Sequence, residues 1–239
     1  METEFEYLGK CLLVSENGKK ILVVGDLHLG YEEGLNNSGV LVTRQMFKEM
    51  IEYFDSVFER VGKVDYIVLL GDVKHEFGGI LRQEWNDVLG LFDYLENKCR
   101  EIIIVRGNHD NILEPIVRKR EKIKIFDYFA FGKYCFAHGD KAFDKMLEKK
   151  IKYWILGHGH PAVKISDGVK VEKYKCFLLG KHKGVKIIIV PSFFEYSEGS
   201  DPRETKLGMA WNFNLDKFKV LAIGDNLEVL DFGQLGKLR

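Results

Sequence analysis

Short apolar runs that end at or near glycine alternate with segments of helical periodicity through the first half of the chain. The runs ILVVG (21–25), YIVLLG (66–71) and IIIVRG (102–107) are rich in β-branched and aliphatic residues. Such runs predict strands that are buried on both faces of a sheet. Apolar residues recur at helical spacing between them, over 46–61 and 81–95. The first half is therefore predicted to be β-α-β-α-β, with parallel strands and right-handed crossovers.

Thr43 is the expected N-cap of the first of these helices, because a threonine side chain can accept a backbone N–H of the first turn.

The second half has many strand-like runs and few helical segments. We expect this half to form a second, more antiparallel sheet and the whole chain to be an α/β fold, a four-layer α/β/β/α sandwich of two mixed sheets flanked by helices. No repeat or Pro-rich linker interrupts the pattern, so residues 1–239 are predicted to form a single domain. The predicted strands are 134–139, 153–158, 176–180, 185–192, 208–214, 219–223 and 227–232, and the clearest predicted helix is 141–150.

The composition is that of an ordinary globular protein. The 239 residues are 46% hydrophobic and 30% charged, and the formal net charge is zero. A neutral chain has no general attraction to nucleic acid or to an anionic membrane, although a local basic patch is compatible with this value. Neither a secretory signal nor an apolar run of transmembrane length is evident, so we expect a cytoplasmic protein without a membrane partner. The oligomeric state is left open, with a dimer among the alternatives.

The four cysteines are dispersed and form no CxxC pair. They are expected to be buried, reduced side chains rather than a disulfide framework or a metal site.

Most of the chemistry-bearing residues follow the predicted strands. Six of the seven histidines lie near a glycine that adjoins an Asp, an Asn or another His, in GDLH, GDVKH, GNHD, AHGD and GHGH. Ligands of α/β sheets collect outside the carboxyl ends of strands, so these side chains should meet. His182, in GKHKG, stands apart and is expected to have no functional role. The candidate ligands are Asp26, His28, Asp72, Asn108, His138, His158 and His160.

Asp, Asn and His side chains together suit divalent ions of intermediate hardness, such as Mn, Fe or Zn. Seven candidate ligands exceed the three or four that a single catalytic ion uses, and they suit two ions bridged by a shared carboxylate. The glycines let the chain turn sharply at each strand end. Residues two apart on an extended segment face the same side, so His158 and His160 can each reach one ion of such a pair.

The motifs GDLH, GD, GNHD, HGD and GHGHP, in this order between residues 25 and 161, resemble those of the calcineurin-like metallophosphoesterase superfamily. That resemblance implies an α/β/β/α sandwich and two metal ions bridged by Asp72. It implies that Asp26, His28, Asp72 and His160 hold one ion, and that Asp72, Asn108, His138 and His158 hold the other. His109 would be the general acid or a phosphate-stabilising residue. Mn is the expected metal, with Fe, Zn, Ni and Mg as alternatives.

The segment GDVKHEF (71–77) bears on the branch of the superfamily. The phosphoprotein phosphatases have GDxVDRG, and here His75 stands at the Asp position and Glu76 at the Arg position. A histidine three residues after the bridging Asp is similar to the GDxFH segment of the double-strand-break-repair exonucleases. The chain thus most resembles the small stand-alone SbcD-related phosphoesterases of archaea and bacteria, and His75 is expected to be catalytic or to contact phosphate.

Hydrolysis of a phosphodiester by a metal-activated hydroxide is the reaction that this resemblance implies. The substrate would be a phosphodiester or a nucleotide, and a nuclease is compatible with the motifs although the neutral charge gives nucleic acid no support. Two alternatives remain: a phosphomonoesterase that acts on a small molecule, and a non-catalytic scaffold that a metal centre stabilises. Asp110 is expected either to orient the His109 imidazole or to cap a helix that begins near Asn111.

Overall fold

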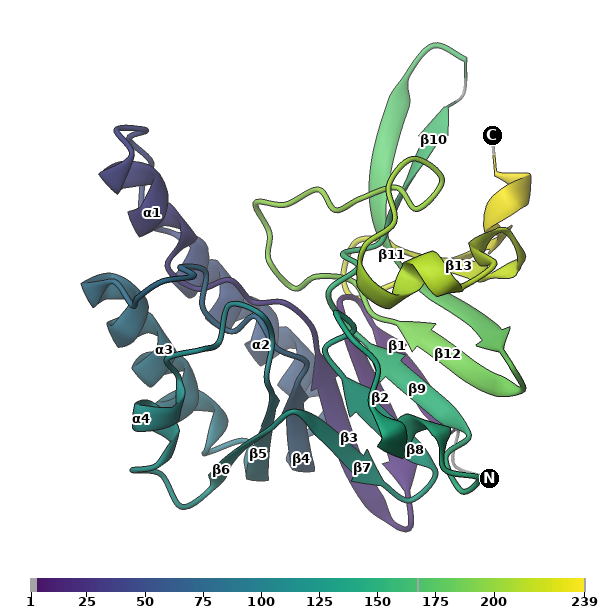
Figure 1. Cartoon of the computed structure of the whole chain (residues 1–239). Coiled ribbons are helices and arrows are strands. Elements are labelled where there is room, and N and C mark those ends of the chain that lie inside the picture. Colours follow the sequence, from purple (N-terminus) through teal and green to yellow (C-terminus); the bar gives the residue numbers. More distant parts are fainter. Residues whose placement is uncertain (1–3, 167, 239) are drawn as a thin grey trace.

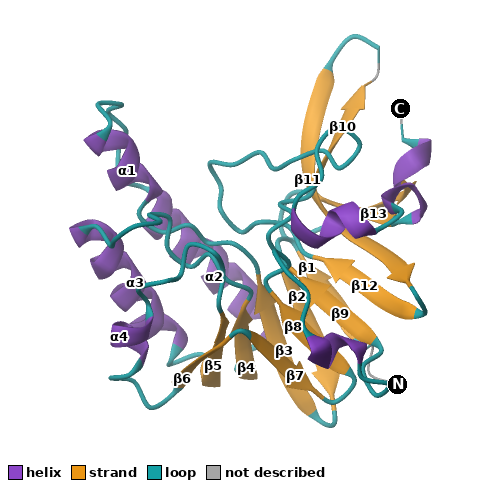
Figure 2. Cartoon of the chain, viewed as in Figure 1, coloured by secondary structure: helices purple, strands orange, loops and turns teal. Residues whose placement is uncertain are grey.

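The protein is built from two sheets packed face to face, in a computed structural model that describes residues 4–166 and 168–238 (Figures 1 and 2). The α-helices lie along the outer side of the first sheet, away from the second (Figure 1). Each sheet contains parallel and antiparallel pairs of strands. The predicted fold class, two mixed sheets of an α/β sandwich, is confirmed.

The first sheet has the strand order β1-β2-β3-β4-β5-β6. Strands β3 to β6 are parallel to one another, and α2 and α3 make the connections between β3, β4 and β5. This confirms the predicted β-α-β-α-β unit. The elements of this half are β1 (Phe5–Leu8), β2 (Cys11–Glu16), β3 (Lys19–Val24), α1 (Tyr31–Asn37), α2 (Met46–Val61), β4 (Val64–Leu69), α3 (Arg82–Leu95), β5 (Cys99–Val105), α4 (Glu114–Val117) and β6 (Ile123–Phe126).

The second sheet has the order β14-β13-β11-β12-β9-β8-β7, with β10 paired to β11. Strands β8, β9 and β12 are parallel, and their neighbours on both sides are antiparallel. Short 3-10 helices lie at 144–147, 208–212, 215–217 and 235–237. The strands are β7 (Tyr128–Phe131), β8 (Tyr134–Ala137), β9 (Tyr153–Leu156), β10 (Ala162–Ser166), β11 (Val171–His182), β12 (Val185–Ile189), β13 (Lys219–Ile223) and β14 (Val229–Gln234).

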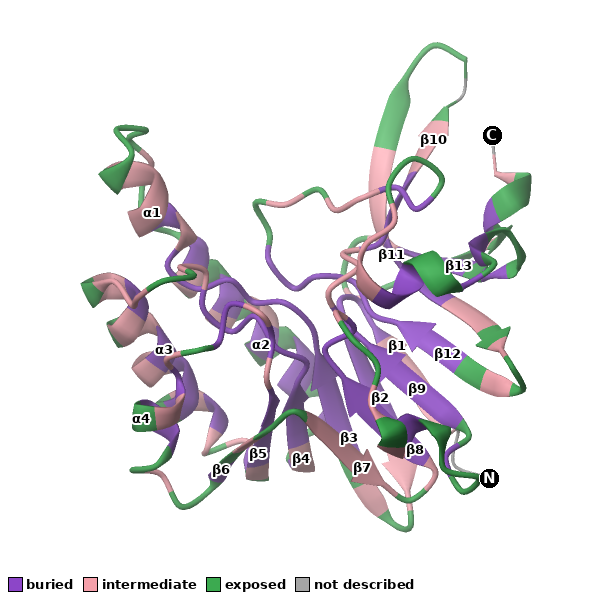
Figure 3. Ribbon diagram, viewed as in Figure 1, coloured by how far each residue is buried: buried purple, intermediate pink, exposed green. Residues whose placement is uncertain are grey.

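The alternation of side chains along a strand separates three apolar layers. In β3, Val24 packs toward the helices while Val23 packs between the sheets. In β9, Ile155 packs between the sheets while Trp154 packs on the outer face of the second sheet. That outer face is covered by 3-10 helices and loops rather than by long helices. Buried residues therefore run through both sheets along their central strands (Figure 3).

Five strands have no counterpart among the predicted runs: β1, β2, β6, β7 and β10. The four cysteines are free and buried, as expected. Within the described part of the chain no helix is long and apolar enough to cross a membrane.

The predicted helix over 141–150 is wrong. Only a 3-10 turn forms there, at Asp144–Leu147. The indole N–H of Trp154 donates to the carbonyl oxygen of Met146 at 2.9 Å. This carbonyl would bond within the segment if an α-helix continued. One buried side chain, Met146, fastens the segment to the outer face of the second sheet.

The predicted strand over 208–214 is also wrong, because Gly208–Asn212 is a 3-10 helix. A strand would place Met209, Trp211 and Phe213 on one face. Instead Met209 and Phe213 are buried and Trp211 is exposed. The N–H of Met209 donates to Gly139 O at 2.8 Å, which ties the segment to the loop after β8.

Thr43 does not cap α2, and a distant carboxylate does so instead. The N-cap residue is Gln45, and no side chain of its own caps the helix. Oε1 of the buried Glu32 accepts the N–H groups of Gln45 at 2.9 Å and Met46 at 3.1 Å. A carboxylate at this position also interacts favourably with the helix dipole.

We therefore expect Glu32→Ala to lower the free energy of unfolding by about 1–2 kcal/mol, because it leaves two N–H groups at the start of α2 without a partner. Thr43→Ala should change it by no more than about 0.5 kcal/mol. Urea denaturation of the metal-free protein measures both values. A larger loss for Thr43→Ala than for Glu32→Ala would contradict the assignment of the cap.

Candidate metal centre

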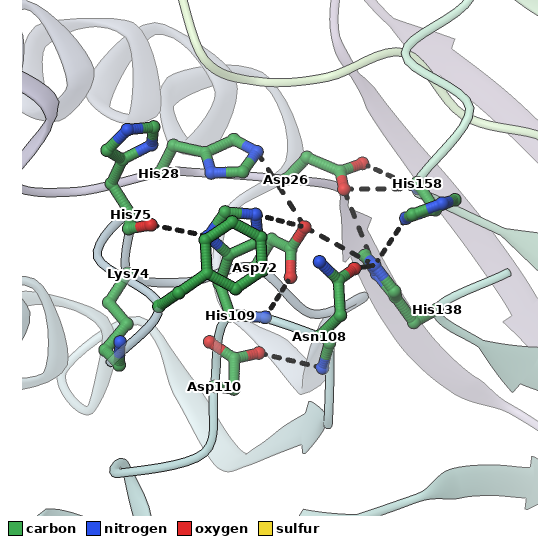
Figure 4. Close-up of polar contacts among 12 residues, drawn as sticks. Asp26, His28, Asp72, Lys74, His75, Asn108, His109, Asp110, His138 and His158 are labelled. Carbon is green, nitrogen blue, oxygen red and sulfur yellow. Dashed lines mark hydrogen bonds and ion pairs between the residues drawn. The ribbon is translucent and has the colours of Figure 1, made fainter. Parts of the chain in front are cut away.

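The predicted ligands come from loops at the carboxyl ends of five parallel strands. These strands are β3, β4 and β5 of the first sheet and β8 and β9 of the second. The two sheets end side by side there, because Gly25 after β3 forms a parallel bridge with Ser192 after β12. Figure 4 shows the polar contacts that join these loops. The candidates that meet there are Asp26, His28, Asp72, Asn108, His109, His138, His158 and His160.

The backbone of these loops is strained at the predicted ligands. Nine non-glycine residues in the described ranges have a positive φ, a conformation that side chains disfavour. Such strain persists only where the surrounding structure enforces it, and it is concentrated at functional sites. Five of the nine are predicted ligands: Asp26 (φ 45°), His28 (48°), Asp72 (48°), His158 (61°) and His160 (40°).

Gly107 shows why the motifs contain glycine. A Cβ atom at this position would lie 2.2 Å from Oδ1 of Asp72. The GNHD loop can therefore approach the Asp72 carboxylate only if residue 107 lacks a side chain. This close approach lets the N–H of His109 donate to Asp72 Oδ1 at 3.0 Å.

One group of ligands surrounds Asp26. Its Oδ1 lies 3.2 Å from Nε2 of His160, and its Oδ2 accepts the N–H of His158 at 3.0 Å. Ligand atoms of Asp26, His28 and His160 all lie within 4.8 Å of one another. Oδ2 of Asp72 is 3.9 Å from Nε2 of His28, so Asp72 borders this group.

A second group surrounds Nε2 of His138. Oδ1 of Asn108 and Nδ1 of His158 each lie 3.0 Å from that nitrogen, and Oδ2 of Asp72 lies 3.4 Å from it. Nδ1 of His138 is 2.7 Å from the carbonyl oxygen of Leu70, which turns Nε2 toward the group. Four side chains thus present nitrogen and oxygen atoms to one point.

These donors fit divalent cations. Each group offers imidazole nitrogens with carboxylate or amide oxygens and no thiolate, a set that suits Mn, Fe or Zn. Nδ1 of His28 is buried without a hydrogen-bond partner among the described residues. Two imidazole nitrogens 3.0 Å apart, those of His138 and His158, need a proton or a cation between them. The Asp72 carboxylate contacts both groups, as a bridging ligand would.

The buried carboxylates and imidazoles of the centre shift one another's pKa values. Burial acts to raise the pKa of Asp72, but its contacts with His138 outweigh this and hold the pKa below its usual value. Burial acts to lower the pKa of His138, and the carboxylates of Asp72 and Asp26 raise it instead to about 9. Burial lowers the pKa of His28 to about 3, so its imidazole is neutral, the form that binds a cation.

The two predicted catalytic residues lie together beside the ligand groups. Nε2 of His109 is 3.9 Å from Oδ2 of Asp72, and Nδ1 of His109 is 2.5 Å from the carbonyl oxygen of His75 (Figure 4). This contact turns Nε2 toward the centre. The imidazole rings of His75 and His109 are stacked with centroids 5.8 Å apart.

Asp110 does neither of the things expected of it. Its carboxylate accepts the N–H of Gly107 and the N–H of Val73, each at 2.9 Å. It therefore joins the GNHD loop to the GDVKH loop, and neither of these hydrogen bonds involves the His109 ring. The next helix begins at Glu114, too far along the chain for Asp110 to cap.

Several residues of the centre were not anticipated. The ring of Phe194 lies 5.4 Å from that of His28 and 4.8 Å from that of Tyr31, and it forms an aromatic wall there. Phe194 follows β12, so the strand-end rule applied to PSFF would have found it. Glu84 accepts the N–H groups of His75 and Glu76, at 2.7 and 2.9 Å. No motif reveals Glu84, because it reaches this loop from the first turn of α3.

His182 lies outside the centre, as expected. Its ring packs near those of Trp154 and Phe213, on the outer side of the second sheet.

A two-sheet α/β sandwich with Asp, Asn and His gathered at the ends of its parallel strands is the arrangement of a metal-dependent hydrolase. The chain belongs to the calcineurin-like phosphoesterase family, whose model matches residues 19–190.

Solved structures that are similar to this chain include two of low sequence identity. A nuclease from Pseudomonas putida, MPE, is 13% identical with a TM-score of 0.63, over 93% of this chain and 100% of that one. The phosphoesterase YfcE from E. coli is 13% identical with a TM-score of 0.45, over 90% of this chain and 98% of that one. A sequence comparison with curated proteins gives no match.

Proposed function

We propose that this protein hydrolyses phosphodiesters at a centre of two divalent cations, with Mn²⁺ as the activating metal. One cation would be held by Asp26, His28, Asp72 and His160, and the other by Asp72, Asn108, His138 and His158. The observation that carries the proposal is the position of the Asp72 carboxylate, 3.9 Å from His28 and 3.4 Å from His138. When bound, such cations neutralise phosphate and make water a strong nucleophile near neutral pH.

His109 is the proposed acid of the reaction. Its Nδ1 faces the His75 carbonyl oxygen, so Nδ1 carries the proton and Nε2 is directed at the centre. In the imidazolium form Nε2 would give its proton to the leaving oxygen. His75 supports this arrangement through its carbonyl and would contact the substrate phosphate through its ring. A scaffold without catalysis would have no need of an oriented imidazole that belongs to neither ligand set.

The charge around the centre favours a diester over a monoester. A monoester dianion needs more positive charge than a diester monoanion. Of the described residues, no lysine or arginine forms an ion pair with Asp26 or Asp72. Lys74 is buried nearby, but its ammonium group donates to the carbonyl oxygen of Glu76 and points away from the carboxylates (Figure 4). Cations and imidazoles would therefore supply the positive charge in direct contact with Asp26 and Asp72.

Nuclease activity is one form of this proposal. The P. putida structure of the same fold is named a nuclease, and the wall formed by Tyr31 and Phe194 would suit a base beside the scissile phosphate. The net charge of zero argues for weak binding of long duplex DNA. Ends, single strands or nucleotides are the substrates that we propose.

Asp72→Asn should weaken both cations together, because only this carboxylate borders both ligand groups. The measurement is elemental analysis after dialysis with Mn²⁺. Asp140→Asn, in the neighbouring HGD motif, is the matched control and should keep two ions per chain. One ion at full occupancy in Asp72→Asn would show that Asp72 does not bridge.

His109→Ala should leave metal content nearly intact and lower kcat by roughly 10²–10⁴-fold, the range for the loss of a general acid. Leaving groups of low pKa need little protonation, so p-nitrophenyl esters should show a smaller defect than alkyl esters. Equal defects on both would indicate that His109 stabilises phosphate instead.

The substrate class is tested with bis-p-nitrophenyl phosphate and p-nitrophenyl phosphate under the same Mn²⁺ concentration. We expect a higher kcat/KM for the diester. His75→Asp, which restores the residue type of the protein phosphatases, should narrow the difference. Faster cleavage of the monoester by the unmodified protein, or a preference that His75→Asp leaves unchanged, would contradict the proposal.

A further inference from the structure

A cleft of about 600 Å³ lies at the end of the sandwich opposite the metal centre. It opens between β1, at the edge of the first sheet, and the inner face of β11, β12 and β13. Tyr153, in the cleft wall, and His158, in the metal centre, are five residue steps apart along β9 and its following loop, which is about 16 Å in an extended strand. We call it the lysine cleft, because four lysines line it. The lining residues on which the proposal depends are Phe5, Tyr153, Lys181, Lys186, Lys217 and Lys219.

Three of these lysines occupy positions that face inward. Leu179, Ile188 and Leu221 belong to or pack against the apolar layer between the sheets. Residues two apart on a strand share a face. Lys181, Lys186 and Lys219 are each two residues from one of those three, and thus point toward the first sheet. The inner face of a sandwich is ordinarily apolar. At this end of the second sheet, lysines take the inward-facing positions instead.

The pairing of these strands places like charges against each other. Lys181 is directly opposite Lys186 in the β11–β12 ladder. Lys219 is opposite Leu179 in the β11–β13 ladder, and Leu179 is two residues from Lys181 on the same face of β11. Like charges directly opposite in a sheet are destabilising. A bound anion would relieve the repulsion.

Few carboxylates balance the lysines. Glu4 is the acidic residue in the cleft wall, and it already pairs with Lys133 at 3.0 Å. Lys219 pairs with Asp231 at 2.7 Å. Lys186 donates to the hydroxyl of Tyr153 at 2.7 Å rather than to a carboxylate. Lys181 and Lys217 form no ion pair with any residue within 4–166 and 168–238.

The remaining wall is aromatic and aliphatic. Phe5, Tyr7 and Tyr153 line it together with Leu179 and Ile188. Its volume lies in the range of sites for organic molecules, about 300–1,000 Å³. Rings beside ammonium groups match a ligand that has a flat aromatic part and several negative charges.

We propose that the lysine cleft binds a nucleotide, a phosphate-bearing ligand with an aromatic base, at a site separate from the metal centre. The phosphates would lie among Lys181, Lys186 and Lys217, and the base against Phe5 and Tyr153. This inference does not depend on the proposed reaction, because no residue of the metal centre takes part.

The test is calorimetric titration with ATP in the presence of EDTA, so that no cation draws phosphate to the metal centre. Lys181→Ala/Lys186→Ala should weaken ATP binding by roughly tenfold or more. Lys63→Ala/Lys119→Ala removes two exposed lysines elsewhere and should leave binding unchanged. Absence of ATP binding, or equal binding by both double variants, would overturn the proposal.

Adenosine and inorganic tripolyphosphate separate the two halves of the ligand. Each should bind at least about tenfold more weakly than ATP if base and phosphates both contribute. If tripolyphosphate bound as tightly as ATP, the lysines would attract any polyanion. If adenosine bound as tightly as ATP, the lysines would contribute nothing to binding. Either result overturns the assignment of a nucleotide.

Lys181→Glu tests the repulsion and the site together, through its opposite effects on Tm and on ATP binding. The new carboxylate opposite Lys186 should raise Tm by about 1–3 °C while it abolishes ATP binding. A lower Tm would contradict the repulsion that the register implies. Retained ATP affinity would contradict the site.

Discussion

Two carboxylates, those of Asp26 and Asp72, are buried at the ends of neighbouring parallel strands, and the rest of the centre depends on keeping them charged. Isolated ionised groups cannot be buried at this depth without compensation. The N–H groups of His158 and His109 donate to them, and imidazoles surround them. The two carboxylates in turn raise the pKa of His138 to about 9, against the opposing effect of burial. A pair of cations would take over the same electrostatic role.

The loops that carry these groups stabilise one another through their backbones. The N–H groups of Leu27 and His28 both donate to Asp72 O, at 3.0 and 2.8 Å, and the N–H of Phe194 donates to Asp26 O at 3.1 Å. Backbone bonds of this kind hold Asp26, His28 and Asp72 at positive φ, a conformation that costs of order 1–3 kcal/mol at each residue. The strands on either side are fixed by the apolar layers, so stability of the sandwich offsets the strain at its edge.

The parts of this structure that sequence could predict are those governed by local pattern. Buried parallel strands are continuous apolar runs in the sequence. Because ligands gather at the carboxyl ends of such strands, the sequence predicted that all seven candidate ligands lie at one edge of the fold. Elements whose conformation depends on contacts with residues distant in the sequence were not predicted. The 3-10 turn at 144–147 depends on the indole of Trp154, and the start of α2 depends on Glu32 from another helix. The loop that bears His75 depends on Glu84 in α3, which no motif marks.

The distribution of charge likewise depends on which residues the fold brings together, and composition alone does not predict it. A formal net charge of zero describes a sum over the chain and says nothing about where the charges lie. In this sandwich the carboxylates and imidazoles gather at one end of the parallel strands, and lysines crowd the inner face at the other. The hydrophobic layer between the sheets separates the two ends and keeps each from neutralising the other. Neutral composition therefore coexists with two sites of opposite electrostatic character, one suited to cations and one to anions, and only the strand register reveals the second.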